Sequence, residues 1–348
     1  MKAAAINAFG GPEVVEPLEL PTPEPGPGQV RVRVRAAGVQ PVDGAVRRGL
    51  FHTGTTPAFP LTIGNDFAGV VDRTGEDADG FAADGFRAGG SPADGSTAGG
   101  STAGGSTAGG STAGGSTADG FPAGGFPVGA EVLGWAPMAC HAEYVVVPVD
   151  QIVAKPAGMP WEVAGAFSAS AQTAHTALEL LGVGAGDTLL VHAAAGGVGT
   201  VAVQLARAYG ATVIGTASPR NHDYLRSLGA LPVAYGDGLV ERVRALAPRG
   251  ITVALDAAGG AALDASVELV ADRDRIGTIV GFDRAPALGV RALRTQRSAA
   301  RLSALTGLWT EGRLRVEVSR TFPLERAADA HRAIETGHGR GKIALVMG

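Results

Sequence analysis

Three closely spaced glycines, Gly196, Gly197 and Gly199, follow a short apolar run. An amphipathic segment comes directly after them, and a second, β-branched apolar run ends at Thr216. This order predicts strand, turn, helix and strand in one unit of about 30 residues. Glycines let the backbone approach a pyrophosphate closely, and the amides that open a helix attract anions. The turn is therefore predicted to bind a dinucleotide, although Ala194 replaces the first glycine of the usual pattern.

The residues after the second apolar run indicate which dinucleotide binds. NAD-binding units usually carry an acidic residue about 20 residues after the glycines, where it accepts hydrogen bonds from the ribose 2′-hydroxyl. Ala217 stands near that place, and Ser218, Arg220 and Asn221 follow it without a carboxylate. A planar guanidinium suits a 2′-phosphate. These residues favour NADPH over NADH, with a solvated surface arginine as the alternative interpretation of Arg220.

The composition narrows the functions that the chain can have. Its 348 residues suffice for two domains, each with its own core. A formal net charge of −4 without a basic run argues against nucleic acid and anionic membranes as partners. No apolar stretch reaches the ~18 residues of a membrane span, and the N-terminus shows no signal-peptide pattern. We therefore expect a cytoplasmic protein with a small-molecule substrate.

The elements around the glycine turn predict two kinds of domain. Residues 1–75 alternate in hydrophobicity with period two, which is typical of β-structure. From Trp161 the pattern turns helical, and strands then alternate with helices, which predicts a doubly wound parallel sheet. Residues 299–348 predict helix, strand, helix and strand. We expect this tail to return to the first domain.

Residues 77–126 form a low-complexity insert of ten consecutive pentamers, four of which read TAGGS. With almost no bulky apolar side chains, these repeats cannot offset the entropy that ordering would cost. We expect a flexible surface loop inside a hairpin whose strands lie near Val70 and Val132. A tether or docking segment is the alternative interpretation.

Several motifs resemble the medium-chain dehydrogenase/reductase superfamily, and within it the zinc-independent branch of quinone oxidoreductases and enoyl reductases. They cover nearly the whole chain outside the insert and include AAGVQPVDGAVRRG (36–49), IGNDFAGVV (63–71), QTAHTAL (172–178), HAAAGGVG (192–199) and GKIALV (341–346). The resemblance implies an α/β protein with a GroES-like β-rich catalytic domain and a Rossmann doubly wound parallel-sheet cofactor domain. It places the catalytic domain at 1–153, the cofactor domain at 154–284, and residues 285–348 back in the catalytic domain.

The resemblance also implies the residues of the site. Gln40 would lie near the nicotinamide as a catalytic residue, and Thr173 would contact the nicotinamide half of the cofactor. The other contacts would surround the pyrophosphate (Gly196, Gly197 and Val198), the 2′-phosphate (Ser218, Arg220 and Tyr235) and the nicotinamide ribose (Gly281 and Phe282). For Gln40, Thr173 and Tyr235 the alternative is a polar residue of the core or surface without a ligand.

Zinc-dependent relatives carry a cysteine and a His-Glu pair at three positions that correspond here to Gln40, Asn65 and Asp66. Neither glutamine nor asparagine is a usual zinc ligand. The cysteine-rich structural lobe is also missing, since Cys140 is the single cysteine. The resemblance therefore implies no metal site and reduction by hydride transfer alone.

The proton donor is left open by the resemblance. Many relatives carry a tyrosine two residues after the glycine that corresponds to Gly49, and this chain has Phe51 there. His52 is adjacent and could titrate near neutral pH, so it is the candidate catalytic acid, with a plain surface histidine as the alternative. A quinone needs such a donor less than an enoyl substrate, because its product oxyanion can take a proton from solvent.

These features predict an NADPH-dependent reductase that transfers hydride to a quinone or another conjugated carbonyl acceptor. One alternative is a stand-alone enoyl reductase for an α,β-unsaturated thioester or ketone in a biosynthetic pathway, and another is an NADPH-binding protein with little turnover. A carrier-bound enoyl substrate would need a basic rim, for which the candidates are Arg47, Arg48, Arg294 and Arg297. Relatives often dimerise through the cofactor domain, so we expect a homodimer.

Overall fold

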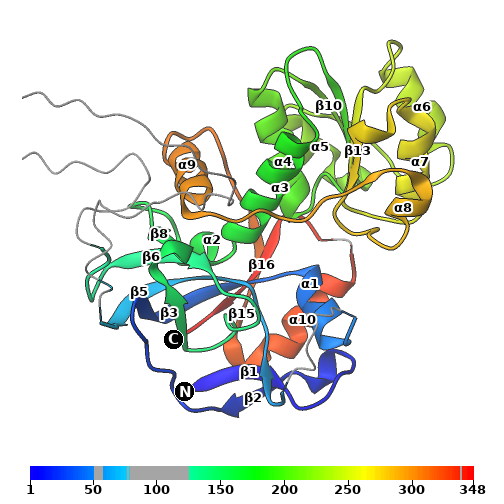
Figure 1. Ribbon diagram of the computed structural model, residues 1–348. Helices are drawn as coiled ribbons and strands as arrows, with labels where there is room; N and C mark the ends of the chain where they lie inside the picture. Colours follow the sequence, from blue (N-terminus) through cyan, green and yellow to red (C-terminus); the bar gives the residue numbers. More distant parts are fainter. Residues whose placement is uncertain (51–57, 77, 79–124, 338) are drawn as a thin grey trace, which may run out of the picture.

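The computed structural model describes residues 1–50, 58–76, 78, 125–337 and 339–348. The chain folds into two halves, one rich in antiparallel strands and one built on a parallel sheet (Figure 1). His52 and most of the predicted insert lie outside the described residues. Within them, no helix is both long and apolar enough to cross a bilayer.

The β-rich half contains two sheets. The smaller, antiparallel sheet has the order β2-β1-β4 and consists of Glu16–Glu19 (β2), Lys2–Ile6 (β1) and Leu61–Thr62 (β4). The larger sheet has the order β15-β16-β3-β5-β6-β8, and β7 pairs with β3. Its strands are β3 (Gln29–Val39), β5 (Asp66–Thr74), β6 (Glu131–Trp135), β7 (Tyr144–Pro148), β8 (Ile152–Ala154), β15 (Val318–Pro323) and β16 (Lys342–Val346). Helices α1 (Pro41–Arg47) and α10 (Ala327–Glu335) belong to this half.

Strand β3 shows why the period-two pattern forms this sheet. Val30, Val32 and Val34 are buried, whereas the arginines between them are exposed or half-buried, as alternating side chains on a half-buried strand must be. β16 pairs with β3, so the last strand of the chain joins the sheet of the N-terminal segment (Figure 1).

The hairpin predicted around the insert is present. β5 and β6 pair antiparallel, with Gly69 opposite Val132 and Val70 opposite Glu131. Ala78 and Phe126, two residues of the segment predicted to be a loop, are buried in the core of this half. The core therefore includes both ends of that segment.

The other half is a six-stranded parallel sheet in the order β11-β10-β9-β12-β13-β14. Numbered along the chain, this is the 3-2-1-4-5-6 order of dinucleotide-binding sheets, with its switch point between β9 and β12. The strands are β9 (Thr188–Val191), β10 (Thr212–Thr216), β11 (Leu231–Val233), β12 (Val253–Asp256), β13 (Ile276–Thr278) and β14 (Arg291–Ala292). The helices are α2 (Trp161–Gly165), α3 (Ser168–Leu180), α4 (Gly197–Ala208), α5 (His222–Ser227), α6 (Leu239–Leu246), α7 (Ala261–Leu269), α8 (Ala285–Leu288) and α9 (Ala299–Thr310).

Two details differ from the sequence expectations. The helical stretch from Trp161 is interrupted between α2 and α3, at the point where α2 packs against β3. A Cβ on Gly165 would lie 2.5 Å from the carbonyl of Ala36, so the chains approach too closely for a larger residue. The parallel sheet also continues to β14, beyond residue 284, and we propose that the cofactor domain ends after β14.

Candidate active site

The glycine turn joins β9 to α4 at the switch point of the parallel sheet. Ala193 adopts a left-handed conformation with φ 53°, which few residues other than glycine do. A Cβ on Gly199 would lie 2.4 Å from Ala193 O, so the turn closes too tightly for a side chain there. Among the described residues no side chain caps α4, so the amides that open this helix have no side-chain acceptor there.

A cavity of about 640 Å³ extends from this turn to the β-rich half, and we call it the central cavity. It brings together six residues predicted from the sequence: Gln40, Thr173, Gly196, Gly197, Val198 and Phe282. Gly281 is not in its lining but precedes Phe282, and His52 lies outside the described residues. The central cavity is thus lined by segments from both halves of the molecule.

Gln40 is held at the wall of the central cavity by two buried aspartates. Its Nε2 donates to Asp66 Oδ2 (2.9 Å), and its backbone N donates to Asp43 Oδ2 (2.8 Å). Ala169 N also donates to Asp66 Oδ2 (2.8 Å). Burial raises the pKa of both carboxyls above the ordinary range. Asp43 and Asp66 therefore position Gln40 from behind the cavity wall.

Thr173 faces the segment that connects β14 to α9. Its hydroxyl hydrogen-bonds the hydroxyl of Thr295 at 2.7 Å, and both residues line the central cavity. Arg297, from the same segment, also lines the cavity, and its guanidinium donates to Asn65 O (3.4 Å). This segment consequently bridges the two halves at the cavity.

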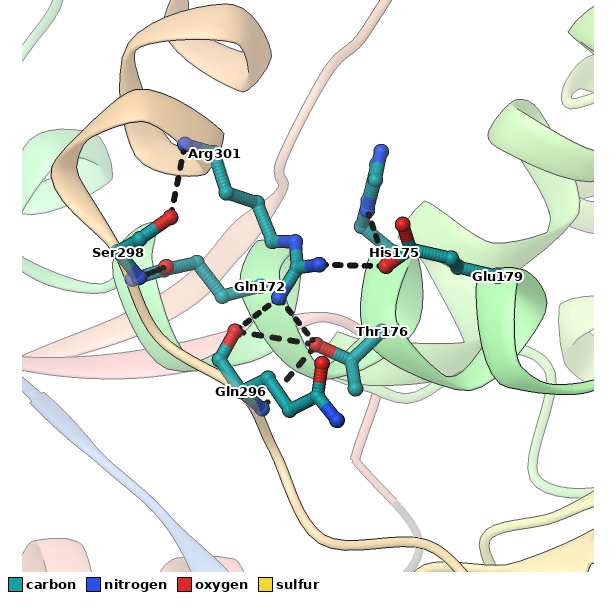
Figure 2. A network of polar contacts seen from close by, with 7 residues as sticks. All are labelled: Gln172, His175, Thr176, Glu179, Gln296, Ser298 and Arg301. Carbon is teal, nitrogen blue, oxygen red and sulfur yellow. Dashed lines mark hydrogen bonds and ion pairs between the residues drawn. The ribbon is translucent and has the colours of Figure 1, made fainter. Parts of the chain in front are cut away.

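A polar network ties this segment to α3 (Figure 2). Gln172 Oε1 accepts from Ser298 N (2.9 Å), and Thr176 Oγ1 accepts from Gln296 N (3.2 Å). Arg301 donates to Thr176 Oγ1 (3.1 Å) and forms an ion pair with a glutamate of α3, Glu179. The network fixes the segment that carries Thr295 and Arg297.

Phe282 is positioned by the ends of two neighbouring strands. Asp256, at the end of β12, accepts from Thr278 Oγ1 (2.7 Å), and that oxygen accepts from Gly281 N (2.8 Å). The Arg294 guanidinium lies 5.3 Å from the centroid of the Phe282 ring. Phe282 and Arg294 thus form one wall of the central cavity.

A second cavity, of about 740 Å³, lies on the other side of the glycine turn and shares Ala193 and Gly196 with the first. Ser218 and Tyr235 line it, as the sequence predicts, whereas Arg220 is exposed and lies outside its lining. We call it the adenosine-side cavity, after the moiety that these residues were predicted to surround.

Carboxylates form part of the adenosine-side lining, which the sequence analysis did not anticipate. They come from α6, from α7 and from the loop before α6: Asp237, Glu241, Asp264 and Glu268. Asp264 pairs with Arg284 (2.6 Å) and Glu268 pairs with Arg244 (2.9 Å). The central cavity has the opposite charge, because its described lining has four cations and no carboxylate: Arg294, Arg297, Arg340 and Lys342.

The candidates for a basic rim divide into two pairs. Arg294 and Arg297 line the central cavity, but Arg47 and Arg48 line neither cavity. Both of these form ion pairs with Glu335 and so tie α1 to α10. Arg47 is fully buried and cannot form a rim, whereas for Arg48 the expectation stays a prediction. The partner of both lies almost 300 residues away, where nothing local in the sequence reveals it.

Lys342 is the residue of the central cavity that the sequence analysis missed. It is charged, yet it opens the apolar strand β16 and is 4% exposed. One signal was available, since a lysine at the head of an apolar strand is unusual in a chain with three lysines. Ala193 is a second residue that the sequence analysis missed. Its unusual feature is the left-handed backbone conformation, of which the sequence gives no sign.

Two family models match the chain. The model described as an alcohol dehydrogenase GroES-like domain matches residues 26–157, and the model described as a zinc-binding dehydrogenase matches residues 228–345. Among the described residues, no group of three or more His, Cys, Asp or Glu could hold a metal ion.

Curated relatives include a quinone oxidoreductase and polyketide synthase proteins. A quinone oxidoreductase from Pseudomonas aeruginosa is 26% identical over 99% of both chains. The polyketide synthase system protein NorB from Streptomyces orinoci is 32% identical over 63% of this chain. The present chain spans 10% of the length of that synthase protein.

Solved structures show the same architecture along the whole chain. The quinone oxidoreductase from Coxiella burnetii has a TM-score of 0.77 and 28% identity, with 99% of each chain covered. The mycobacterial protein Rv1454c, solved in complex with NADPH, has a TM-score of 0.77 and 25% identity, with 99% and 100% covered. Taken with the two family models, these similarities show that the chain belongs to the medium-chain dehydrogenase/reductase superfamily, in its quinone oxidoreductase branch.

Proposed function

We propose that this oxidoreductase transfers hydride from a nicotinamide cofactor to a quinone or another conjugated carbonyl acceptor. The observation that carries the proposal is the central cavity, which runs from the glycine turn to Gln40 and joins both halves. The full-length similarity to the Pseudomonas aeruginosa quinone oxidoreductase supports the acceptor class. When bound, the cofactor would supply the hydride, and the protein would orient both molecules and exclude water.

The residues present fit a dinucleotide. The amides that open α4 and the glycines at 196 and 197 would take the pyrophosphate, because glycines carry no side chain to keep the phosphates away from the backbone. Thr173, Gly281 and Phe282 would meet the nicotinamide half. Ser218 and Tyr235 would meet the adenosine half, where both line the same cavity.

NADPH is the proposed form of the cofactor. No carboxylate follows β10 in residues 217–221, where an NAD-binding unit would carry one. The complex of Rv1454c with NADPH supports the same choice. Asp237 and Glu241 line the adenosine-side cavity and would repel a phosphate, so a preference for NADPH has to come from Ser218 and Arg220.

We propose that the reaction needs no zinc. Gln40 and Asn65 occupy two of the ligand positions of zinc-dependent relatives, and Gln40 turns its amide nitrogen toward Asp66. Asn65 Nδ2 likewise donates to Asp43 Oδ1 (2.8 Å). Zinc in proteins is bound by thiolate, imidazole or carboxylate groups and not usually by amides, so these positions support cofactor chemistry without a metal.

A stand-alone enoyl reductase is the second candidate. Arg294 and Arg297, on the acceptor side of the central cavity, offer charge to a phosphorylated carrier, and NorB shares more sequence identity with the chain than the quinone oxidoreductases do. The third candidate is an NADPH-binding protein with little turnover. The experiment must distinguish it from the two reductases.

The test is an acceptor panel with the purified full chain. Oxidation of NADPH is followed against 1,4-benzoquinone, 9,10-phenanthrenequinone, crotonyl-CoA and a simple enone, with NADH in parallel. We expect quinones to be reduced fastest and NADPH to be preferred. Arg220→Ala should reduce the preference for NADPH over NADH by about tenfold or more, because a charge-assisted contact to the phosphate is lost.

The matched control is Arg226→Ala, an exposed arginine of α5 that pairs with Asp223 and lines neither cavity. Turnover of the thioester or the enone alone would favour the enoyl reductase. Binding of NADPH without turnover of any acceptor would favour the binding protein. An unchanged preference in Arg220→Ala would contradict the 2′-phosphate contact alone.

A further inference from the structure

Lys342 extends along the wall of the central cavity beside the glycine turn. A Cβ on Gly197 would lie 2.6 Å from Lys342 Cδ and 2.8 Å from Ser170 Oγ, so the lysine stem fills the space beside that glycine. Gly341 N donates to Ala195 O (2.8 Å), which fixes the start of β16 against the turn. Among the described residues, Lys342 Nζ has no hydrogen-bond or ion-pair partner.

Lys342 is the one described lining residue of this cavity that can release a proton in the working pH range. The other lining side chains are apolar, amide, hydroxyl or guanidinium groups. Asp43 and Asp66 are fully buried behind the wall and outside the lining. Phe51, at the position of the family's tyrosine, has no acidic hydrogen.

Four charged or titratable groups act on Lys342: Asp43, Asp66, Arg297 and His141. Burial is the largest cause and lowers the pKa of the lysine, the two carboxyls raise it, and the Arg297 charge lowers it again, so that the net pKa lies below the ordinary value. Burial also lowers the pKa of His141, so this histidine is neutral near pH 7. Lys342 therefore releases its proton more readily than an exposed lysine, which suits a general acid.

We propose that Lys342 is the general acid that completes the reduction after hydride addition. The inference rests on the reductase function proposed above. The acceptor gains a hydride with its electron pair from the reduced nicotinamide and becomes an oxyanion, an enolate or a hydroquinone anion. One Nζ–H bond of Lys342 then breaks, the proton joins the α-carbon or the oxygen of that anion, and the neutral amine regains a proton from solvent.

The rival role for the same ammonium is a contact to a cofactor phosphate, because its stem lies beside Gly197. Lys342→Arg separates the two roles. A guanidinium keeps the positive charge for a phosphate, but it cannot give up a proton at any working pH.

The first measurement needs no turnover. The chain has three lysines, Lys2, Lys155 and Lys342, and one N-terminal amine, so reductive carbon-13 methylation of the full chain gives four signals for NMR titration. The signal absent from Lys342→Arg identifies Lys342. We expect it to titrate below the ordinary pH range of a lysine side chain.

The second measurement is kinetic. Lys342→Arg should lower kcat for an enone or enoyl thioester by about 100-fold or more and for a quinone much less, with the dissociation constant of NADPH retained. The alkaline limb of the wild-type kcat profile should fall at the pH where the Lys342 signal titrates. Lys155→Arg is the matched control, since that side chain is also buried but pairs with Glu131 outside both cavities.

Two results would contradict the general acid and leave the reductase function intact. In the first, Lys342→Arg reduces the enone with the kcat of wild type and with an unchanged alkaline limb. In the second, Lys342→Arg binds NADPH more weakly but keeps its kcat, which would assign Lys342 to a cofactor phosphate. A wild-type protein that reduces no acceptor would instead contradict the reductase function, and the general acid with it.

Discussion

At the scale of single residues, the polar groups at the central cavity are held by hydrogen bonds to neighbouring side chains. Asp66 holds Gln40, Thr295 holds Thr173, and Thr278 holds the backbone of Gly281. Each contact uses a hydrogen bond that water would otherwise take, so the side chains keep one orientation without a ligand. This preorganisation is what hydride transfer requires, since the protein mainly has to align two molecules.

His331 gives a prediction for stability in acid. It is fully buried in α10, and neither ring nitrogen has a hydrogen-bond partner among the residues described. Burial, aided by the nearby charges of Arg47 and Arg48, lowers its pKa from 6.5 to about 3. Below pH 6.5 the unfolded chain therefore takes up a proton before the folded one, and stability is lost as the pH falls from about 6.5 to about 3.

The measurement is urea unfolding of wild type and His331→Leu at a series of pH values in that window. We expect His331 to make the free energy of unfolding fall by up to about 1.4 kcal/mol for each unit by which the pH decreases, and we expect the variant to lack this contribution. His222→Leu, a half-buried histidine of α5, is the control. Equal slopes for wild type and His331→Leu would show that another group carries the acid sensitivity.

At the scale of elements, α3 and the segment before α9 act as one unit. Their polar network (Figure 2) crosses more than a hundred residues of sequence and holds Thr295 and Arg297 at the central cavity. Loops that carry functional groups keep their geometry only when the scaffold fixes them. We therefore expect damage to the network to affect both stability and acceptor binding.

Arg301→Leu tests this expectation. The variant loses the ion pair with Glu179 and the hydrogen bonds to Thr176 and Gln296, all made by a side chain that is 15% exposed. We expect a loss of about 1–3 kcal/mol in the free energy of unfolding and a higher KM for the acceptor. Arg313→Leu is the control and breaks an exposed ion pair with Glu311. It should lower the free energy of unfolding by less than about 1 kcal/mol and leave KM unchanged. Similar losses in both variants would argue against a positioning role for the network.

At the scale of the whole molecule, the two halves depend on each other for the central cavity. Gln40 comes from the first segment of the chain, Thr173 and Phe282 from the parallel half, and Lys342 from the last strand. Both chain ends lie in the β-rich half, where β16 joins β3 (Figure 1). The division at 154 and near 292 remains a proposal, but neither half alone contains the cavity.

The resemblance to relatives that associate through the cofactor domain predicts a homodimer. The short strand β14 is at one edge of the parallel sheet, and Ala292 in it is exposed, so this edge is our candidate contact. Light scattering after size exclusion should give twice the mass of one chain. Ala292→Lys should shift the mass toward one chain, whereas Arg313→Leu, a substitution of an exposed residue outside β14, should not. A wild-type mass of one chain would exclude the dimer.

The sequence by itself determined the elements whose signals are local. The glycine spacing predicted the turn before α4, the alternation in β3 predicted a half-buried strand, and the hairpin of β5 with β6 was placed at Val70 and Val132. Such patterns are readable because a side chain's face depends on its nearest neighbours in the chain.

Only the tertiary structure decided where charges separated in sequence meet. It paired Arg47 and Arg48 with Glu335, placed carboxylates at the adenosine side, and brought Lys342 beside Gly197. Arg220 proved to lie outside both cavity linings, while Ser218 two residues earlier lies inside one. No local pattern encodes these outcomes, because burial and electrostatic partners arise from packing between segments more than a hundred residues apart.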